Sequence, residues 1–294
     1  MFNSSKCMCV LSATPSLWTT TLRQLLHKKL TVVALMVVLL YTSVALLAHW
    51  GFVAAHWEAE VGDSYAAPSL QHWLGTDIFG RSVLAKVIKS TEVAMSVGFV
   101  VGLIAIIIGV VLGALAGYFG GLVDECIVWF YTTVASIPNT ILLVALTFIL
   151  GKGIFSVYVA LGVTNWVELC RLIRGEVKRH KDREYVQAAT ALGANHLRKL
   201  CRHILPNVLH IVIIRFSLIF QFAIKSEVVL SYLGLGVQGS PSWGVMIDDA
   251  KLELTRGIWW QLVFATLAMF FIVLAFNILS DALRDALDPK LKGK

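Results

Sequence analysis

Residues 93–119 read VAMSVGFVVGLIAIIIGVVLGALAGYF and contain no Asp, Glu, Lys or Arg. About 20 apolar residues in an α-helix cross a bilayer core of about 30 Å, so this stretch is long enough to span a membrane. The whole chain has the same character: of its 294 residues, 57% are hydrophobic and 15% are charged, and the mean hydropathy is +0.77. Soluble domains carry about 25% charged residues. The sequence therefore predicts an integral membrane protein.

Glycines recur within this stretch at intervals of four. The pairs are Gly98 with Gly102, Gly109 with Gly113, and Gly113 with Gly117. In lipid, this spacing lets the backbone of a neighbouring helix come close, and such packing drives helix association. We expect these glycines to contact another helix of the same chain. A contact with a second subunit is the alternative.

Five other stretches are apolar and long enough to cross a bilayer. The sequence predicts an all-α integral membrane protein with six transmembrane helices, at residues 30–50, 93–119, 123–150, 155–172, 204–233 and 259–279. The fourth is the weakest, because it contains Asn165 and Glu168. The first begins too far into the chain, and is too long, for a secretory signal peptide, so we expect it to stay as a helix.

The distribution of Lys and Arg predicts the orientation, because basic residues are retained on the cytoplasmic side. They gather before the first predicted helix, between the fourth and fifth, and after the sixth. Arg81, Lys86 and Lys89 depart from this pattern, but they fall in a long outer loop. We expect cytoplasmic tails at residues 1–29 and 281–294, an outer loop at 51–92, and a five-helix core at 93–280 with a cytoplasmic loop at 173–203. Topology then explains the net charge of +7, and no nucleic-acid partner is expected.

Pro138 lies in the middle of the third predicted helix and should kink it, because proline removes one backbone hydrogen bond. Freed backbone groups at membrane depth are tolerated where protein or a wet cavity satisfies them. Ser136, Pro138 and Asn139 are therefore candidates for lining a wet path. A kink that serves only packing is the alternative.

The fifth predicted helix carries Arg215, Gln221, Lys225 and Glu227. Charged residues inside a membrane usually face a partner or a wet path. Gln221 and Lys225 share a helix face, whereas Glu227 points elsewhere. We take Gln221 and Glu227 as further candidates for the path. A Glu227 side chain that reaches the headgroups from the outer end of the helix is the alternative.

The polar segment between the fourth and fifth predicted helices, residues 184–207, reads EYVQAATALGANHLRKLCRHILPN. Gly193 can end one helix in the left-handed conformation, Asn195 can cap the next, and Pro206 fits the first turn of the fifth membrane helix. An apolar stripe at helical spacing comprises Val186, Ala189, Gly193, Leu197, Leu200 and Ile204. We expect two short helices that lean on the membrane domain and offer their other side to a partner. An amphipathic helix on lipid headgroups is the alternative.

The same segment resembles the EAA loop of ABC importer permeases. The matching residues are Gln187-Ala188-Ala189, then Gly193 after three residues, then Leu205-Pro206. Gln187 stands where the family has Glu, with Glu184 one turn earlier, and His203 stands in a position usually held by Ile. These departures leave an acidic contact at position 187 unsupported, but they leave the backbone roles of Gly193 and Pro206 intact.

Two further segments resemble the C-type permease subunits of dipeptide, oligopeptide and nickel importers. They are LGTDIFGRSVLAKV at residues 74–87, in which Ser82 stands where the family usually has Asp, and LSYLGLGVQGSPSWGVMI at 230–247. The resemblance covers the chain from about residue 30 onward. It implies a type I ABC importer permease fold in the bacterial cytoplasmic membrane, with residues 51–92 in the periplasm and both termini in the cytoplasm.

The resemblance also implies a function and partners. Such a permease forms half of a translocation pathway with a sister permease as a heterodimer, two separate ATP-binding subunits bind ATP and Mg²⁺, and a periplasmic or lipoprotein binding protein delivers the cargo. Peptides are the expected cargo, with nickel chelates or glutathione-like solutes as the alternative. The residues expected to contact the ATPase are Glu184, Tyr185, Gln187, Ala188, Ala189, Leu192, Gly193, Ala194, Asn195 and Pro206.

The sequence indicates that this chain does not itself catalyse a reaction. No GxxxxGK[ST] segment is present to hold a nucleotide, and neither HExxH nor GxSxG occurs, so an intramembrane enzyme is not favoured. His196, His203 and His210 are spaced by seven, which separates neighbours by about 10 Å along a helix, too far to share a metal ion. We expect no catalytic residues, no metal site and no cofactor on this chain. A self-contained channel or secondary transporter remains the alternative.

Overall fold

The computed structural model describes residues 25, 26 and 28–287. Most of the predicted N-terminal tail and the last residues of the C-terminal tail lie outside this part. The described chain is helical and contains no β-strand, which confirms the predicted fold class. Its helices are α2 (Lys29–His49), α3 (Val83–Phe119), α4 (Gly121–Ala135), α5 (Asn139–Leu150), α6 (Ile154–Thr164), α7 (Val167–Lys181), α8 (Glu184–Ala191), α9 (His196–Arg198), α10 (Leu205–Tyr232), α11 (Trp243–Leu254) and α12 (Trp260–Leu287), with a π-helical turn at Lys199–Ile204.

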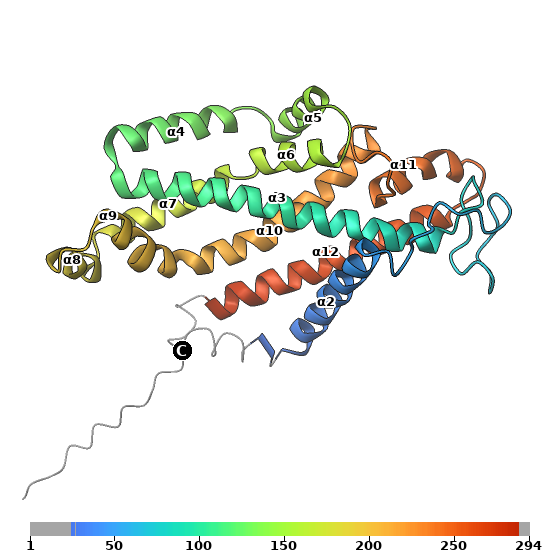
Figure 1. The fold of residues 1–294 in the computed structure, drawn as a ribbon, viewed down its shortest axis with the longest axis horizontal. Coiled ribbons are helices and arrows are strands. Elements are labelled where there is room, and N and C mark those ends of the chain that lie inside the picture. Colours follow the sequence, from blue (N-terminus) through green and yellow to red (C-terminus); the bar gives the residue numbers. More distant parts are fainter. Residues whose placement is uncertain (1–24, 27, 288–294) are drawn as a thin grey trace, which may run out of the picture.

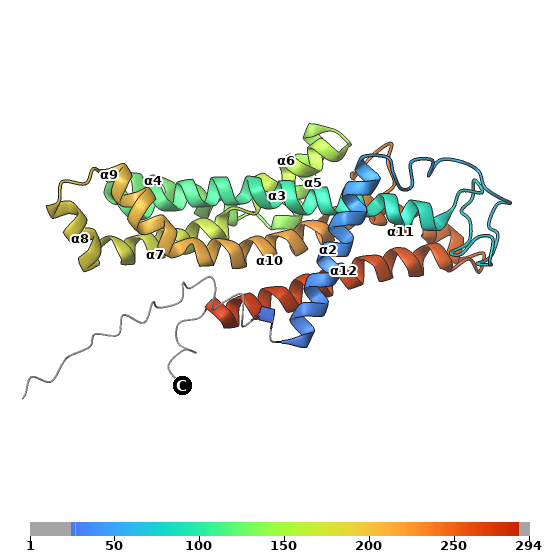
Figure 2. The same cartoon turned by 60° about the horizontal axis from the view of Figure 1, so that its bottom comes forward.

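Helix α3 is the central element, and it packs against α2, α4, α6, α7 and α10 (Figures 1 and 2). Its glycines allow the closest of these contacts. A Cβ atom on Gly113 would lie 2.7 Å from the Cys170 carbonyl oxygen in α7, and one on Gly102 would lie 2.6 Å from the Phe216 ring in α10. The predicted close approach is confirmed, and these contacts are made within the chain.

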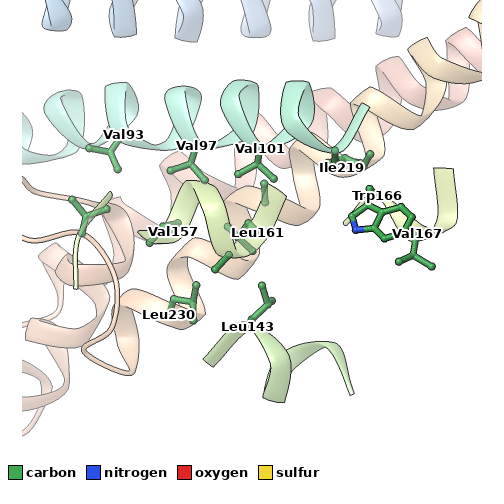
Figure 3. Close-up of a cluster of buried hydrophobic side chains, with 14 of the residues drawn as sticks. Val93, Val97, Val101, Leu143, Val157, Leu161, Trp166, Val167, Ile219 and Leu230 are labelled. Carbon is green, nitrogen blue, oxygen red and sulfur yellow. The ribbon is translucent and has the colours of Figure 1, made fainter. Parts of the chain in front are cut away.

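Buried aliphatic side chains fill the space beneath α3. Figure 3 shows Val97 and Val101 of α3 above Val157 and Leu161 of α6, which are all fully buried, with Ile219 of α10 nearby. Cβ-branched and leucine side chains interlock here, so the position of α6 is fixed between α3 and α10. This packing holds the helices that surround the cavity described below.

Two of the predicted spans are broken. α4 and α5 meet at an angle of 88°, so the predicted kink at Pro138 is a full break rather than a bend. Pro138 itself is extended, with φ −55° and ψ 125°, and proline cannot donate the backbone hydrogen bond that would carry the helix on. The fourth predicted span is divided between α6 and α7, and the Asn165 amide donates to the Leu161 carbonyl at 2.7 Å in this break.

Among the described residues, four helices are long and apolar enough to cross a membrane: α2, α3, α12 and one continuous helix from His196 to Tyr232. The bent α4–α5 pair adds a fifth if it counts as one span. α6 and α7 have 11 and 15 residues and do not reach this length, so the fourth predicted span, and with it the predicted total of six, is not confirmed. Lys28 pairs with Asp285 at 2.8 Å, which brings the start of α2 next to the end of α12.

One predicted boundary is wrong. α3 begins at Val83, ten residues before the predicted start, because Ser82 caps it by accepting from the Ala85 amide at 3.4 Å. Asp is an equally good N-cap, which accounts for the exchange of these two residues at this position. Pro206 lies in the first turn of α10, as predicted, but α10 also continues from α9 through the π-helical turn at Lys199–Ile204. The wider turn lies directly before the proline, where a regular α-helical hydrogen bond is lost.

Candidate functional site

The segment at residues 184–204 projects at one end of the molecule, opposite α11 and the long loop before α3 (Figure 1). α8 ends at Ala191, and Gly193 turns the chain with φ +79°. The Asn195 side chain then accepts from the Arg198 amide at 2.8 Å and caps α9. The predicted helix, turn and helix are confirmed in shape, and we call residues 184–204, from α8 through the π-helical turn, the insert.

The inner side of the insert is anchored to α3 and α7. Val186, Leu200 and Ile204 are buried in a cluster with Tyr118 and Val177. The Tyr118 hydroxyl also lies 2.9 Å from the His196 ring nitrogen Nδ1. A movement of the insert must therefore displace the ends of α3 and α7.

The outer side of the insert carries two bare leucines. Leu192 is 88% exposed and Leu197 is 71% exposed, and a Cβ atom on Gly193 would meet open space. The predicted apolar stripe is thus wrong at Gly193 and Leu197, which point outward. Of the residues predicted to contact an ATPase, Ala189 faces inward and is 8% exposed, and Ala194 is half-buried. The other eight are exposed: Glu184, Tyr185, Gln187, Ala188, Leu192, Gly193, Asn195 and Pro206.

Tyr185 closes the junction between α7 and α8. Its hydroxyl lies 2.8 Å from Nδ1 of His180. Partial burial raises the pKa of the Tyr185 phenol and lowers the pKa of the His180 imidazole, so both neutral forms are favoured. A hydrogen bond between two uncharged side chains therefore links the end of α7 to the start of α8.

A cavity of about 470 Å³ lies where the broken helices meet α10. Pro138 and Asn139 line it at the α4–α5 break, as predicted for path candidates, and Asn165 lines it at the α6–α7 break. Ser136 is exposed beside this break but is not among the lining residues.

Gln221 and Glu227 do not line this cavity. Gln221 is 3% exposed and its amide donates to the Ser280 hydroxyl of α12 at 3.3 Å. Glu227 is 1% exposed and accepts from the Ser231 hydroxyl at 2.6 Å, so it does not reach the headgroups. The Gln221 hydrogen bond joins α10 to α12, whereas the Glu227 hydrogen bond lies within α10, because Ser231 is one turn further along the same helix.

The cavity contains an ion pair that the sequence did not predict. Nη1 of Arg215 in α10 lies 2.7 Å from Oε2 of Glu168 in α7. Arg171, one turn after Glu168, also lines the cavity, and its guanidinium lies 4.9 Å from the centre of the Tyr131 ring. The sequence places Glu168 and Arg215 inside two different predicted spans, but no pattern in it indicates that the two side chains pair.

Comparison with known proteins identifies the fold. Residues 109–293 match the family of binding-protein-dependent transport system inner membrane components. The chain belongs to this family. It is 35% identical over 226 residues to the dipeptide transport system permease protein DppC of Bacillus subtilis (strain 168). This match covers 76% of this chain and 71% of that protein. It is 33% identical over 277 residues to DppC of Alkalihalophilus pseudofirmus, and 35% identical over 281 residues to the glutathione transport system permease protein GsiD of Shigella dysenteriae serotype 1; both matches cover 94% of this chain and 91% of the relative.

The match confirms the expected permease of an ABC importer, a multi-pass protein of the bacterial inner membrane. The similar proteins are transport permeases and not enzymes. An importer of this family works as a complex with ATPase and binding-protein partners.

At the other end of the permease, the GTDIFGR segment forms a buried polar anchor. Asp77 is 2% exposed, and its Oδ1 accepts from the backbone amides of Phe79 and Arg81, both at 2.9 Å. Its Oδ2 accepts from Lys86 of α3 at 3.0 Å, and Lys86 also donates to Gln261 of α12 at 3.1 Å. The segment thus ties the long loop to two membrane helices.

Glu253 of α11 lies at the edge of this anchor. It is 3% exposed, and its Oε2 has no hydrogen-bond partner within the described residues. Burial raises the pKa of its carboxyl to about 7, although the nearby Lys86 acts in the opposite direction. The group therefore titrates near neutral pH.

Proposed function

We propose that this permease imports short peptides as one half of a heterodimeric pathway, with ATP hydrolysed on separate chains. Its partners are a sister permease, two ATP-binding subunits that hold ATP and Mg²⁺, and a periplasmic or lipoprotein binding protein that delivers the peptide. The similarity of the chain to dipeptide and glutathione transport permeases supports this cargo. Both ends of the chain, in this proposal, lie in the cytoplasm with the insert.

The exposed leucines of the insert are the observation that carries the proposal. A polar surface element with Leu192 88% exposed and Leu197 71% exposed is typical of a site that another protein covers. The inner side of the insert is already used by the membrane helices. The outer side is therefore the surface that docks onto an ATP-binding subunit.

The connections of the insert explain how docking reaches the cavity. The insert joins α7 to the continuous helix His196–Tyr232, and Glu168 and Arg215 pair across these same two helices. Arg215 lies about 28 Å along the helix axis from His196, at 1.5 Å per residue. A displacement of the insert thus moves both members of the ion pair. Closure of the ATP-binding subunits would select between two packings of α7 and α10.

Pro138 and Asn139 line the translocation pathway in this account, with Ser136 beside them. Asn165, Glu168, Arg171 and Arg215 complete its polar lining. Gln221 supports the pathway by holding α10 against α12, and Glu227 accepts from Ser231, which in turn accepts from Ser242 at the start of α11.

The docking claim is tested by copurification. The double variant Leu192→Glu, Leu197→Glu places two carboxylates on the proposed contact. We expect the amount of ATP-binding subunit that copurifies with the tagged permease to fall at least about tenfold, since buried unpaired charges at an interface are costly.

Leu70→Glu is the matched control, because Leu70 is 96% exposed in the loop between α2 and α3, and Figure 1 shows this loop at the opposite end of the molecule from α8. This variant should copurify with the ATP-binding subunits as the parent does. Undiminished copurification of the double variant would contradict the proposed docking surface.

A further inference from the structure

We propose that the membrane cavity is a binding site for the charged ends of the cargo, in which Glu168 takes the α-ammonium group of a short peptide and Arg215 with Arg171 takes its α-carboxylate. This inference rests on the proposed import of peptides. It assigns a specificity role to three residues of the permease itself, in addition to any selection made by a binding protein.

Because Glu168, Arg171 and Arg215 lie deep within the membrane domain, water must reach their side chains. Arg215 lies about 15 Å along α10 from Leu205 and about 25 Å from Tyr232, so it falls within the apolar part of that helix. The Glu168 side chain is 76% exposed. A bare carboxylate facing lipid tails is very unfavourable, whereas one facing a wet path is tolerated. The face with Glu168 is therefore open to water and not to lipid.

The charged groups have unused hydrogen-bonding capacity. Within the described residues, the contact of 2.7 Å between Nη1 of Arg215 and Oε2 of Glu168 is the one hydrogen bond of either side chain. A carboxylate has two acceptor oxygens and a guanidinium has five N–H donors. Arg171 makes a cation–π contact with Tyr131 but no hydrogen bond within the same residues. The site can therefore accept an ammonium and a carboxylate without breaking other contacts.

The exchange leaves no charged group without a partner. A zwitterionic peptide brings one positive and one negative group, which replace the single Glu168–Arg215 pair by one pair at each end of the peptide. A neutral solute of the same size would have to separate Glu168 from Arg215 without giving either side chain a new charged partner. The cavity should therefore discriminate against peptides with a blocked end.

The dimensions fit a peptide of two or three residues. The volume of about 470 Å³ lies in the range of small-molecule sites, about 300–1,000 Å³. Glu168 and Arg171 are three apart on α7, so their Cβ atoms lie about 5–6 Å apart and their charged groups can separate further. An extended chain of two or three residues spans about 7–10 Å. The two ends of such a peptide can reach both residues at once.

The test is uptake by the assembled importer in vesicles, with its binding protein and ATP. Three cargoes are compared: a dipeptide, its C-terminal amide and its N-acetyl form. For Arg215→Gln we expect the ratio of dipeptide uptake to amide uptake to fall about tenfold relative to the parent, the effect of losing one charge-assisted hydrogen bond. For Glu168→Gln, the ratio of dipeptide uptake to N-acetyl uptake should fall by a similar factor. Selection by the binding protein cancels, because it is the same for every permease variant.

Lys225→Gln is the matched control, because Lys225 is an exposed cation of the same helix that does not line the cavity. It should leave both ratios unchanged. Arg171→Gln, at an exposed position, provides a second variant if the loss of Arg215 prevents assembly, and it should lower the same ratio as Arg215→Gln.

Two results overturn the inference in distinguishable ways. If the parent importer takes up the dipeptide and the variants change all three uptakes by one common factor, or by none, the charged pair is structural and the peptide-import proposal stands. If the parent importer takes up no peptide in the presence of ATP, the proposed function fails and this inference fails with it.

Discussion

Glu253 is the residue whose protonation should control the stability of the outer end. Its folded-state pKa of about 7 lies above the ordinary value of 4.5, so the folded protein holds this proton more tightly than the unfolded chain does. The free energy of unfolding therefore falls as the pH rises from about 4.5 to 7, and this loss is complete above pH 7. Glu253→Gln removes the charge, and we expect it to raise the melting temperature at pH 8 by about 2–4 °C, the shift that about 1 kcal/mol produces in a protein of this size.

The measurement is thermal unfolding of the purified permease in detergent at pH 5 and pH 8. The Gln variant should show a smaller difference between the two values of pH than the parent. Glu60→Gln, at an exposed position in the long loop, should behave as the parent does. An unchanged pH dependence in Glu253→Gln would contradict the assignment.

Residue roles that depend on local geometry were predictable from the sequence. Gly193 and Asn195 form the turn and cap that their residue types favour. The direction of Leu197 was not predictable, because α9 has three residues and continues into a π-helical turn, which shifts the faces away from a regular helical period. The burial of Glu227 was also missed, since its partners Ser231 and Ser242 lie on α10 and at the start of α11.

Among the helices, the contact between α3 and α7 depends on the absence of side chains. A Cβ atom on Gly113 would lie 2.7 Å from the Cys170 carbonyl oxygen, a backbone atom that cannot rotate away. We expect Gly113→Ala to force the helices apart and destabilise the permease by about 1–3 kcal/mol. The measurement is thermal unfolding of the purified protein.

Gly175 of α7 supplies the control, since a Cβ atom there would meet no atom within 4 Å. Gly175→Ala should be neutral or stabilise the helix by about 0.5–1 kcal/mol, because alanine loses less backbone entropy than glycine on folding. Equal effects of the two substitutions would contradict the close packing of α3 on α7.

The existence of the long helices was predictable, because runs of apolar residues report directly on membrane spans. The positions and angles of the breaks in these helices were only partly predictable. Pro138 predicts a kink, but the angle of 88° depends on how α5 packs against α6. The break at Asn165 has no proline, and the start of α3 at Val83 depends on a Ser82 cap that precedes the apolar run.

On the scale of the whole molecule, the insert and the cavity are connected by the two helices that flank the insert. The sequence identified the insert, because its turn, cap and motif spacing are local. It did not identify the cavity ion pair, because Glu168 and Arg215 lie 47 residues apart and meet only through packing of α7 on α10. Long-range pairing of this kind is set by tertiary structure, and no local pattern encodes it.

The central claim is that the insert is the contact through which separate ATP-binding subunits drive this permease. An electron cryomicroscopy structure of the assembled importer tests it most directly. We expect Leu192 and Leu197, which are 88% and 71% exposed in the permease alone, to be buried in a groove of an ATP-binding subunit. An assembled importer in which both leucines remain bare or face only lipid would contradict the account.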